Sequence, residues 1–522
     1  MIRQFWLILL LVLLNAYSAT ANVLYVDCSG PNDPGSGTLE DPFRTIQYGI
    51  NTAIAGDTVQ LNIGIYTGAG NYDIDPCGKS ITIQSINPED AGVVANTIID
   101  PDKNGRGFYI HNGEDSNCII AGLTIRNAGI PGGYNGAGIY CDSSNPVITD
   151  CVIQNGYAEG SGGGICLDNS NITIVNCTIK DNTADYYGGG ISSRFSSPTL
   201  IGCTISGNIA GGRGGGIDCG QSDSNIINCV IINNSAPEGG GINCYYPGIT
   251  NVVNCTIAAN SADYSGGAVY CQYNGIAHIK NSIMWADSQE LSLDYDGYIS
   301  VKYCDVEDGQ IAVYDPCGLL VWGEGNIDID PCFAFFDLEG NPDLCDFHLK
   351  STAGRWNSTF YNIDLNKDGI INLSEFVGLA DVWRQQGNSP QDLDYSGIVD
   401  WTDMELFAQY YLANSIKDGW ITDSSTSPCV DAGDPKSEWA SEPWPNGKRI
   451  NLGAYGSTTQ ASKNGNIADL NLDGRVNFCD LAVFGALWGT NQKSIEDLNG
   501  NGIVDAGDLE IIAANWLWEK QQ

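Results

Sequence analysis

The stretch NITIVNCTIKDNTADYYGGGI, from Asn171 to Ile191, decides the fold because its pattern repeats along the middle of the chain. Cysteines recur every 26 residues, and asparagines follow in a second column with the same period. The columns are Cys151, Cys177, Cys203, Cys229, Cys255 and Asn182, Asn208, Asn234, Asn260. Short runs of alternating apolar and polar residues, bounded by Gly and Asn, are typical of strands. The chain from about Gly136 to Ile279 is therefore expected to be a β repeat.

A repeat whose equivalent side chains keep one period stacks like residues on like in successive coils. Parallel strands about 4.8 Å apart produce this stacking. The pattern predicts a mainly β protein, a parallel β-helix solenoid with apolar and Cys side chains inside and Asn at the bends. On its GGGI…NCTI…N.A units, the chain resembles the pectate-lyase-like right-handed β-helix family, with repeats similar to polymorphic-membrane-protein repeats. Upstream, Phe43, Ile46, Ile50 and Ile54 lie on one face of a predicted short helix that would cover the first coil.

Charge and the N-terminus narrow the class of protein. The 522 residues carry a formal charge of −39, which argues against nucleic acid or an anionic membrane as partner. Arg3 precedes an apolar run from Phe5 to Leu14, and Ala19-Thr20-Ala21 offers a cleavage site. Residues 1–21 are therefore predicted to be a signal peptide, since the run is too short for a membrane span. We expect a secreted or cell-surface protein without a membrane-spanning segment.

The 19 cysteines raise the question of disulfide bonds, which export permits. Stacked coils would separate successive Cys residues by about 4.8 Å, more than the ~3.5–4.5 Å between Cβ atoms that a disulfide needs. We interpret the ladder as buried thiols that act as small hydrophobes. A second, looser column is predicted from Cys141, Cys166, Cys219, Cys244 and Cys271. Disulfides are favoured instead among the irregular Cys317, Cys332 and Cys345.

Four twelve-residue segments near the C-terminus share one pattern of oxygen-bearing side chains. They read DLNKDGIINLSE from Asp364, DLDYSGIVDWTD from Asp392, DLNLDGRVNFCD from Asp469 and DLNGNGIVDAGD from Asp497. Oxygen ligands at positions 1, 3, 5, 9 and 12, with Gly at position 6 and a backbone carbonyl at position 7, are the spacing of a calcium loop. We therefore expect Ca²⁺ as a cofactor.

The loops form two pairs, each loop followed by an apolar helix, and Gly or Pro in front of the second and third loops argues against an entering helix. This resembles the type I dockerin, which docks onto a cohesin. The match covers Asn466–Trp518 and, less fully, Asn362–Leu412. The resemblance implies these ligands: Asp364, Asn366, Asp368, Ile370, Asn372, Glu375; Asp392, Asp394, Ser396, Ile398, Asp400, Asp403; Asp469, Asn471, Asp473, Arg475, Asn477, Asp480; Asp497, Asn499, Asn501, Ile503, Asp505 and Asp508.

The resemblance also predicts a cohesin-like partner for residues 466–518. However, most of the hydroxyl residues that contact a cohesin, at loop positions 10 and 11, are absent here. Phe478-Cys479 and Ala506-Gly507 stand there instead. The alternative is that the modules cap or rigidify the C-terminal end. The segments ending at Ser358 and starting at Gly419 read as one closing segment of the solenoid. We thus predict a β-helix over 22–358, an inserted loop pair over 361–412, a closing segment over 419–461 and a terminal module over 466–518.

The sequence does not assign a catalytic residue. Arg213, with Asp218 and Asp185, is the nearest approach to a catalytic group, although chance placement on an acidic surface explains it as well. His111, His278 and His348 are interpreted as isolated structural residues. Six tyrosines offer a sugar-stacking surface, in a column interrupted at Gly212 and Glu238: Tyr157, Tyr186, Tyr187, Tyr245, Tyr246 and Tyr264. Two hypotheses follow: a polysaccharide-binding or polysaccharide-degrading β-helix (a lyase or glycoside hydrolase), or a non-catalytic spacer or adhesin.

Overall fold

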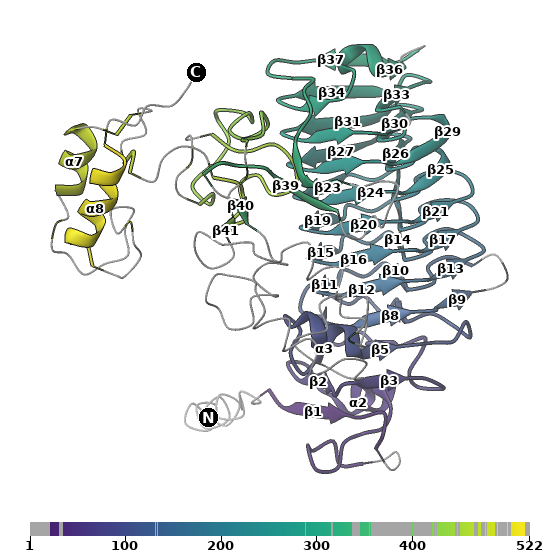
Figure 1. The fold of residues 1–522 in the computed structure, drawn as a ribbon. Helices are drawn as coiled ribbons and strands as arrows, with labels where there is room; N and C mark the ends of the chain where they lie inside the picture. The colour runs from purple at the N-terminus through teal and green to yellow at the C-terminus, as the bar shows by residue number, and fades with distance from the viewer. Residues whose placement is uncertain are drawn as a thin grey trace, which may run out of the picture.

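The protein is represented by a computed structural model of the chain. It describes residues 21–30, 35–356 apart from 131, 133, 288, 315–316, 337–344 and 354, then 399, and 420–463 apart from 422, 424, 444–445 and 447–448. Near the C-terminus it describes 468–470, 475–476, 478–485, 488, 498 and 503–516. Figure 1 shows a tall solenoid of stacked coils, with the helices α7 and α8 side by side and apart from it.

Four parallel sheets form the walls of the solenoid, and successive coils add strands to them in turn. Sheet A comprises β1 (Val23–Val26), β2 (Thr58–Leu61), β4 (Thr82–Ser85), β7 (Ile119–Ala121), β11 (Val147–Thr149), β15 (Thr173–Val175), β19 (Thr199–Ile201), β23 (Ser224–Ile227), β27 (Gly248–Val253), β31 (Gly275–Lys280), β34 (Tyr298–Lys302) and β37 (Leu319–Trp322). Sheet B comprises β3 (Gly64–Tyr66), β5 (Thr97–Ile99), β8 (Thr124–Arg126), β12 (Val152–Gln154), β16 (Thr178–Lys180), β20 (Thr204–Ser206), β24 (Val230–Ile232), β28 (Thr256–Ala258), β32 (Ile283–Trp285) and β35 (Asp305–Val306).

The other two walls follow sheet B along each coil. Sheet D comprises β9 (Gly129–Ile130), β13 (Tyr157–Ala158), β17 (Thr183–Ala184), β21 (Ile209–Ala210), β25 (Ser235–Glu238) and β29 (Ser261–Ser265). Sheet C comprises β6 (Phe108–Ile110), β10 (Ile139–Asp142), β14 (Ile165–Asp168), β18 (Ile191–Arg194), β22 (Ile217–Gly220), β26 (Ile242–Tyr245), β30 (Val269–Gln272), β33 (Leu291–Leu293) and β36 (Val313–Tyr314). The remaining elements are α2 (Ile46–Thr52), α3 (Ala91–Asn96), the 3₁₀ helix η1 (Gly309–Ala312), β38 (Phe333–Phe335), β39 (Asp346–Leu349), β40 (Arg355–Trp356), β41 (Trp420–Ile421), α7 (Phe478–Gly485) and α8 (Ala506–Ala514).

The core confirms the predicted solenoid and its cysteine ladder. Ile153, Ile179 and Ile205 pair in register on successive coils, and each is fully buried. The five ladder cysteines, Cys151 to Cys255, are at most 1% exposed and belong to the same core. All nineteen cysteines lie in the described residues, and none forms a disulfide bond, including Cys317, Cys332 and Cys345. The expected disulfides among those three are therefore not found.

The second cysteine column needs a correction. Cys141 pairs with Leu167, and Leu167 with Ser193, before the row continues through Cys219, Cys244 and Cys271. Cys166 instead pairs with Tyr140 and Ser192, one position along the strand. Since successive strand residues point to opposite faces, a shift of one position moves Cys166 from the inner row to the outer face of sheet C.

The asparagine column forms a continuous ladder of hydrogen bonds inside the bends. The backbone N–H of Asn208 donates to Asn234 Oδ1 at 3.0 Å, and its Nδ2 donates to the carbonyl of Ile179 at 2.9 Å. Its own Oδ1 accepts from the N–H of Asn182 at 3.1 Å. Asn208 is fully buried, so these bonds satisfy polar groups that water does not reach.

The glycine clusters let neighbouring coils approach closely at these bends. Gly188 adopts φ +61°, a left-handed conformation that other residues rarely take. A Cβ added to Gly189 would lie 2.5 Å from the carbonyl oxygen of Ile209. A side chain at position 189 would therefore push adjacent coils apart.

The N-terminal end of the solenoid is covered as predicted, with one exception. Phe43, Ile46 and Ile50 are at most 2% exposed, and α2 packs on β1 and β2. Ile54 follows the end of α2 and is 53% exposed, so it takes no part in the covered face. The helix breaks at Ala53, whose extended backbone ends the helical face before Ile54.

Residues 427–463, here called the return segment, pack against the outer face of sheet B rather than over the last coil. Nδ2 of Asn228 donates to the carbonyls of Ala454 and Gly456, and Lys280 forms an ion pair with Asp434 at 2.6 Å. Val230 and Ile283 share an apolar cluster with Leu452 of this segment. Because these contacts reach the flank of the solenoid from Asn228 to Ile283, the predicted closing segment lies along its side.

Strands β40 and β41 pair antiparallel, with Arg355 opposite Ile421. The chain therefore leaves at 356 and returns at 420 to the same place. The predicted inserted pair over 361–412, except Val399, and residues 1–20 of the predicted signal peptide over 1–21 lie outside the described residues, so both stay predictions. In the part of the chain that is described, no helix is long and apolar enough to span a membrane.

Candidate functional site

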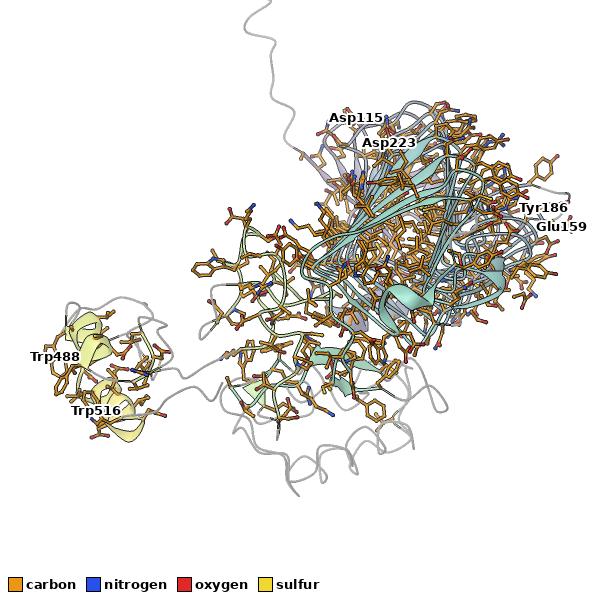
Figure 2. The ribbon with its side chains drawn as sticks, turned by 90° about the horizontal axis from the view of Figure 1, so that it is seen from above. Asp115, Glu159, Tyr186, Asp223, Trp488 and Trp516 are labelled. Atoms are coloured by element: carbon orange, nitrogen blue, oxygen red, sulfur yellow. The ribbon has the colours of Figure 1, made fainter. Side chains whose placement is uncertain are left out.

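A cleft of about 380 Å³ opens on the outer face of sheet C, where it meets the turns from sheet D. We call it the tyrosine cleft, lined by Asn135, Ser161, Cys166, Leu167, Asp168, Tyr186, Tyr187, Ser192, Arg194, Arg213, Asp218, Gly220, Gln221, Tyr245 and Tyr246. Strands β14, β18, β22 and β26 supply its floor, because every second residue of these strands points outward. Figure 2 shows Tyr186 at the outer edge of the solenoid.

Asp218 is the buried carboxylate of the floor. Its side chain accepts a hydrogen bond from Asn243 Nδ2 at 2.6 Å, and the residue is 8% exposed. Burial raises the pKa of Asp218 to about 6, although the hydrogen bond from Asn243 and the charges of Arg213 and Arg194 act in the opposite direction. A carboxyl group in this state can hold or release a proton near neutral pH.

Arg213 stands on the wall of the cleft between aromatic rings. Residues Tyr187, Arg213 and Glu238 align in register on successive coils. Its Nε donates to Glu238 Oε2 at 2.8 Å, and its guanidinium lies 4.3 Å from the ring centroid of Tyr245. The side chain is thus a fixed positive charge, because guanidinium groups keep their proton in proteins.

A stack of tyrosines, Tyr245, Tyr246, Tyr273 and Tyr295, continues from one end of the cleft. The rings of Tyr245 and Tyr273 are 5.3 Å apart, and those of Tyr273 and Tyr295 are 4.5 Å apart and nearly parallel. Three of them, Tyr246, Tyr273 and Tyr295, adopt φ of 63°, 50° and 45°. The residues that follow the earlier strands of sheet C, Asn169, Phe195 and Gln221, adopt the same left-handed conformation, so it belongs to this bend of the solenoid.

The opposite end of the same face is also aromatic. Tyr109 and Tyr140 stack at 5.7 Å, and the guanidinium of Arg106 lies about 5 Å from each ring centroid, at 4.8 and 5.1 Å. Aromatic rings therefore line the outer face of sheet C on both sides of the tyrosine cleft, with the guanidinium of Arg106 at one end. This arrangement suits an extended ligand that crosses several coils.

Comparison with known proteins places the fold. The family described as right handed beta helix region matches residues 70–219 and 106–333, which together span just over half of the chain. The chain belongs to this right-handed β-helix family. No curated protein matches the sequence.

Among solved structures, the pectate lyase Pel9A is 13% identical with a TM-score of 0.43, over 84% of this β-helix chain and 96% of its own. A rhamnogalacturonan lyase is 14% identical with a TM-score of 0.37, over 61% of this chain and 91% of its own. An alginate lyase from Paenibacillus sp. str. FPU-7 is 14% identical with a TM-score of 0.26, over 59% and 99%.

The β-helix separates the three residues grouped from sequence. Asp218 and Arg213 both line the cleft, whereas Asp185 accepts hydrogen bonds from the hydroxyl of Tyr157, at 3.0 and 3.1 Å, and does not line it. Glu238, which had been taken as a gap in the tyrosine column, is the carboxylate partner of Arg213. The pair could not be predicted from the sequence, because Arg213 and Glu238 are 25 residues apart, whereas the repeat was traced at a spacing of 26 residues.

The predicted sugar-stacking tyrosines divide between two places in the β-helix. Tyr186, Tyr187, Tyr245 and Tyr246 line the cleft. Tyr157 binds Asp185, and Tyr264 is 77% exposed beside a different cavity. Tyr273 and Tyr295 were not predicted, because the spacings from Tyr246 to Tyr273 and from Tyr273 to Tyr295 are 27 and 22 residues and differ from the 26-residue period.

The three histidines lie away from the cleft, but none is isolated as expected. His348 is 5% exposed, its Nδ1 lies 2.6 Å from Asp346 Oδ1, and its ring stacks on Tyr455. His111 stacks on Tyr109, and Nδ1 of His278 is 2.8 Å from the hydroxyl of Ser300. All three contacts are compatible with structural roles.

The structure describes part of the terminal module, including Asp469, Arg475, Asp480, Ile503, Asp505 and Asp508 of the predicted ligands. The other predicted ligands lie outside the described residues. Both helices begin at loop position 10, α7 at Phe478 and α8 at Ala506. Val476 and Val504, at position 8 of each loop, are fully buried in one apolar cluster with Phe484.

The position-12 carboxylates of this module, Asp480 and Asp508, are fully buried. Asp508 Oδ2 accepts from the N–H of Asp505 at 2.9 Å, and Asp505 accepts from the N–H of Gly507, which caps α8. Among the described residues, no group of three or more His, Cys, Asp or Glu side chains is arranged to hold a metal ion. The donors that are described are nonetheless of the oxygen type that Ca²⁺ prefers.

Proposed function

We propose that this protein is an exported carbohydrate-binding β-helix and that the outer face of sheet C binds an extended glycan. One observation carries the proposal: in one open cleft, four tyrosines surround a buried carboxylate and Arg213, whose side chain is oriented by Glu238. Ligand sites combine apolar and aromatic walls with a few fixed polar groups in this way. A sugar offers both apolar ring faces and hydroxyl groups, which match rings such as Tyr245 and acceptors such as Asp218.

Cleavage of the bound glycan is a second candidate, favoured by the chemistry of Asp218. A carboxyl group with a raised pKa can donate a proton to a departing glycosidic oxygen. Asp168 also lines the cleft, and burial together with the nearby charge of Asp142 raises its pKa. Arg213 would contribute a fixed positive charge to the ligand rather than act as a base.

Binding and turnover are separable with three variants of the full chain. A glycan array identifies ligands, and Tyr245→Ala should weaken binding at least tenfold, whereas Tyr264→Ala, an exposed tyrosine outside the cleft, should not. Release of reducing ends or unsaturated products measures turnover. Loss of turnover in Asp218→Asn with binding retained would assign an acid–base role. Neither binding nor turnover by the parent protein would favour the spacer or adhesin instead.

We propose in addition that the loop pairs bind Ca²⁺ and that the terminal module tethers the protein to a cohesin-like partner. The burial of Val476 and Val504 in one cluster, and helices that start at position 10, support a paired-loop module. Bound Ca²⁺ would neutralise the loop carboxylates. Asp469, Arg475 through its carbonyl, and Asp480 would hold one ion, and Ile503 through its carbonyl, Asp505 and Asp508 another.

The partner surface is expected to be apolar rather than rich in hydroxyl groups. Phe478 is 76% exposed at loop position 10 and Trp488 is 51% exposed at the end of the following turn, where Figure 2 shows it on the module. Calcium titration calorimetry on the full chain should give weaker binding for Asp480→Asn and Asp508→Asn. Capture of a cohesin-like protein should require calcium and fail in Phe478→Asp; capture that is unchanged by chelator would contradict the tether.

A further inference from the structure

The asparagine ladder of the bends ends on a carboxylate. The N–H of Asn260 donates to Asp287 Oδ1 at 2.5 Å, and Asn260 Nδ2 donates to the same atom at 3.0 Å. Each earlier step of the ladder has an asparagine in this acceptor position, as Asn260 itself does for Asn234. An amide oxygen at position 287 would accept the same two bonds. The ladder alone therefore gives no reason for a negative charge at its end.

A second carboxylate meets Asp287 at this point. The N–H of Asp287 donates to Glu290 Oε1 at 3.2 Å, and Glu290 is 3% exposed. The remaining oxygens of the two groups, Asp287 Oδ2 and Glu290 Oε2, are both buried and have no hydrogen-bond partner outside the pair among the described residues. Buried polar atoms are almost always paired, and an unpaired charged oxygen is costly. The two facing carboxyl groups therefore need either a shared proton or a cation between them.

The surrounding cavity is acidic throughout. It measures about 590 Å³ and opens between the turn after β32 and the turn that carries η1. Its lining includes five acidic residues, Asp263, Asp287, Glu290, Glu307 and Asp308, and no Lys, Arg or His among the described residues that line it. Glu307 Oε2 accepts from the N–H of Ala286 at 2.6 Å, next to Asp287 in the chain. Among the described residues that line the cavity, no cationic side chain thus balances the Asp287–Glu290 pair.

We propose that Asp287 and Glu290 hold a hard divalent cation, Ca²⁺ or Mg²⁺, at the end of the asparagine ladder. Carboxylate oxygens select such cations over softer metals. Two carboxylates with water in the remaining positions form a weak site, with dissociation constants on the order of 10⁻⁴–10⁻³ M as in extracellular calcium modules. This site is separate from the loops of the C-terminal modules and from the tyrosine cleft, so it stands whether or not a glycan binds.

The ladder provides a variant that removes the ligand and keeps the structure. Asp287→Asn retains the Oδ1 acceptor for Asn260, and Glu290→Gln retains the acceptor for the N–H of Asp287. Asp263→Asn removes a charge from the same cavity without touching the pair and serves as the matched control. Circular dichroism of each full-length variant verifies that the β-helix is intact; if one of the pair variants fails to fold, the other carries the test.

Equilibrium dialysis with radioactive calcium against metal-depleted full chain counts the ions that each protein binds at about 1 mM. The parent and Asp263→Asn should bind about 0.5–0.9 ion more per chain than Asp287→Asn and Glu290→Gln, because a site with a dissociation constant of about 10⁻⁴–10⁻³ M is only partly filled at about 1 mM. The loop sites are common to all four proteins and cancel in this difference. Displacement of that ion by excess Mg²⁺ would identify a site that accepts both cations, and resistance to Mg²⁺ a site selective for Ca²⁺. Equal ion counts in the parent and both pair variants would overturn the proposal and assign a shared proton to the pair.

Discussion

Replacement of Asp218 by asparagine should stabilise the protein above pH 6, although the residue lies in the candidate site. The buried carboxyl group is easier to protonate in the folded protein than in the unfolded chain, where its pKa is near 3.8. Folding therefore becomes less favourable as pH rises, since the folded state must release the proton into an environment that disfavours the charge. Asparagine is neutral at every pH and keeps an oxygen acceptor for Asn243.

The size of the stability difference follows from the change in the pKa of Asp218 on folding. The pKa of Asp218 rises from 3.8 to about 6. At about 1.4 kcal/mol per unit, roughly two units correspond to about 3 kcal/mol of lost stability when the group is charged. The loss begins near pH 4, grows until about pH 6 and is constant above it. Below pH 4 the parent and Asp218→Asn are both neutral at this position and should differ little.

Urea unfolding of the two proteins at intervals from pH 3.5 to 8 measures this difference directly. Other titrating groups are common to both proteins and cancel when one free energy of unfolding is subtracted from the other. We expect Asp218→Asn to gain stability over the parent between pH 4 and 6 and to keep the gain at higher pH. A difference that is flat, or a variant less stable than the parent at pH 7, would refute the reasoning and show that Arg213 and Arg194 stabilise the carboxylate.

Three further predictions concern the solenoid. Asn208→Ala should lower the free energy of unfolding, measured by urea titration, by about 3 kcal/mol, because it leaves buried partners without hydrogen bonds. Asn171→Ala, at an exposed bend, should lower it by less than about 1 kcal/mol in the same titration. Gly189→Ala should lower the free energy of unfolding by about 1–3 kcal/mol, since the added Cβ would contact backbone atoms of the next coil. Gly485→Ala should be neutral or stabilising on thermal unfolding, because a Cβ there has no described atom within 4 Å. Iodoacetamide should label the exposed Cys317 and Cys479 in the folded protein and reach Cys203 only after unfolding, as measured by mass spectrometry. The neighbouring Cys229 and burial both raise the pKa of the Cys203 thiol. Early labelling of Cys203 would show that the ladder opens.

Periodicity was sufficient to predict the solenoid, because a buried position repeats its requirement in every coil. Cys177 and Asn208 have the same environment as their equivalents one coil away, so spacing alone identified the inner column and the ladder. The prediction failed where the spacing was 25 rather than 26, as for Cys166, because a shift of one residue in a strand exchanges its faces. The prediction that Ile54 lies on the covered face of α2 failed for a local reason, since the helix ends before this residue.

The site was less predictable because its parts depart from the 26-residue period. Glu238 meets Arg213 through the register of two turns of unequal length, and Tyr273 and Tyr295 stack across coils of other lengths. The return segment contacts the solenoid across more than 200 residues, from Asn228 to Ala454, and no period relates such positions. Asp287 was overlooked because the asparagine column changes residue type at that step.

The register of sheet C has a consequence for how such a chain can change in length. Ile191 pairs with Ile217 after 26 residues, Ile217 with Ile242 after 25, and Ile242 with Val269 after 27. Turns absorb these differences while the strands stay aligned, so a whole coil can be duplicated or lost between equivalent strand positions without turning the core outward. Selection can therefore lengthen the outer face of sheet C in steps of about 4.8 Å, which would match its extent to the length of its ligand without redesign of the interior.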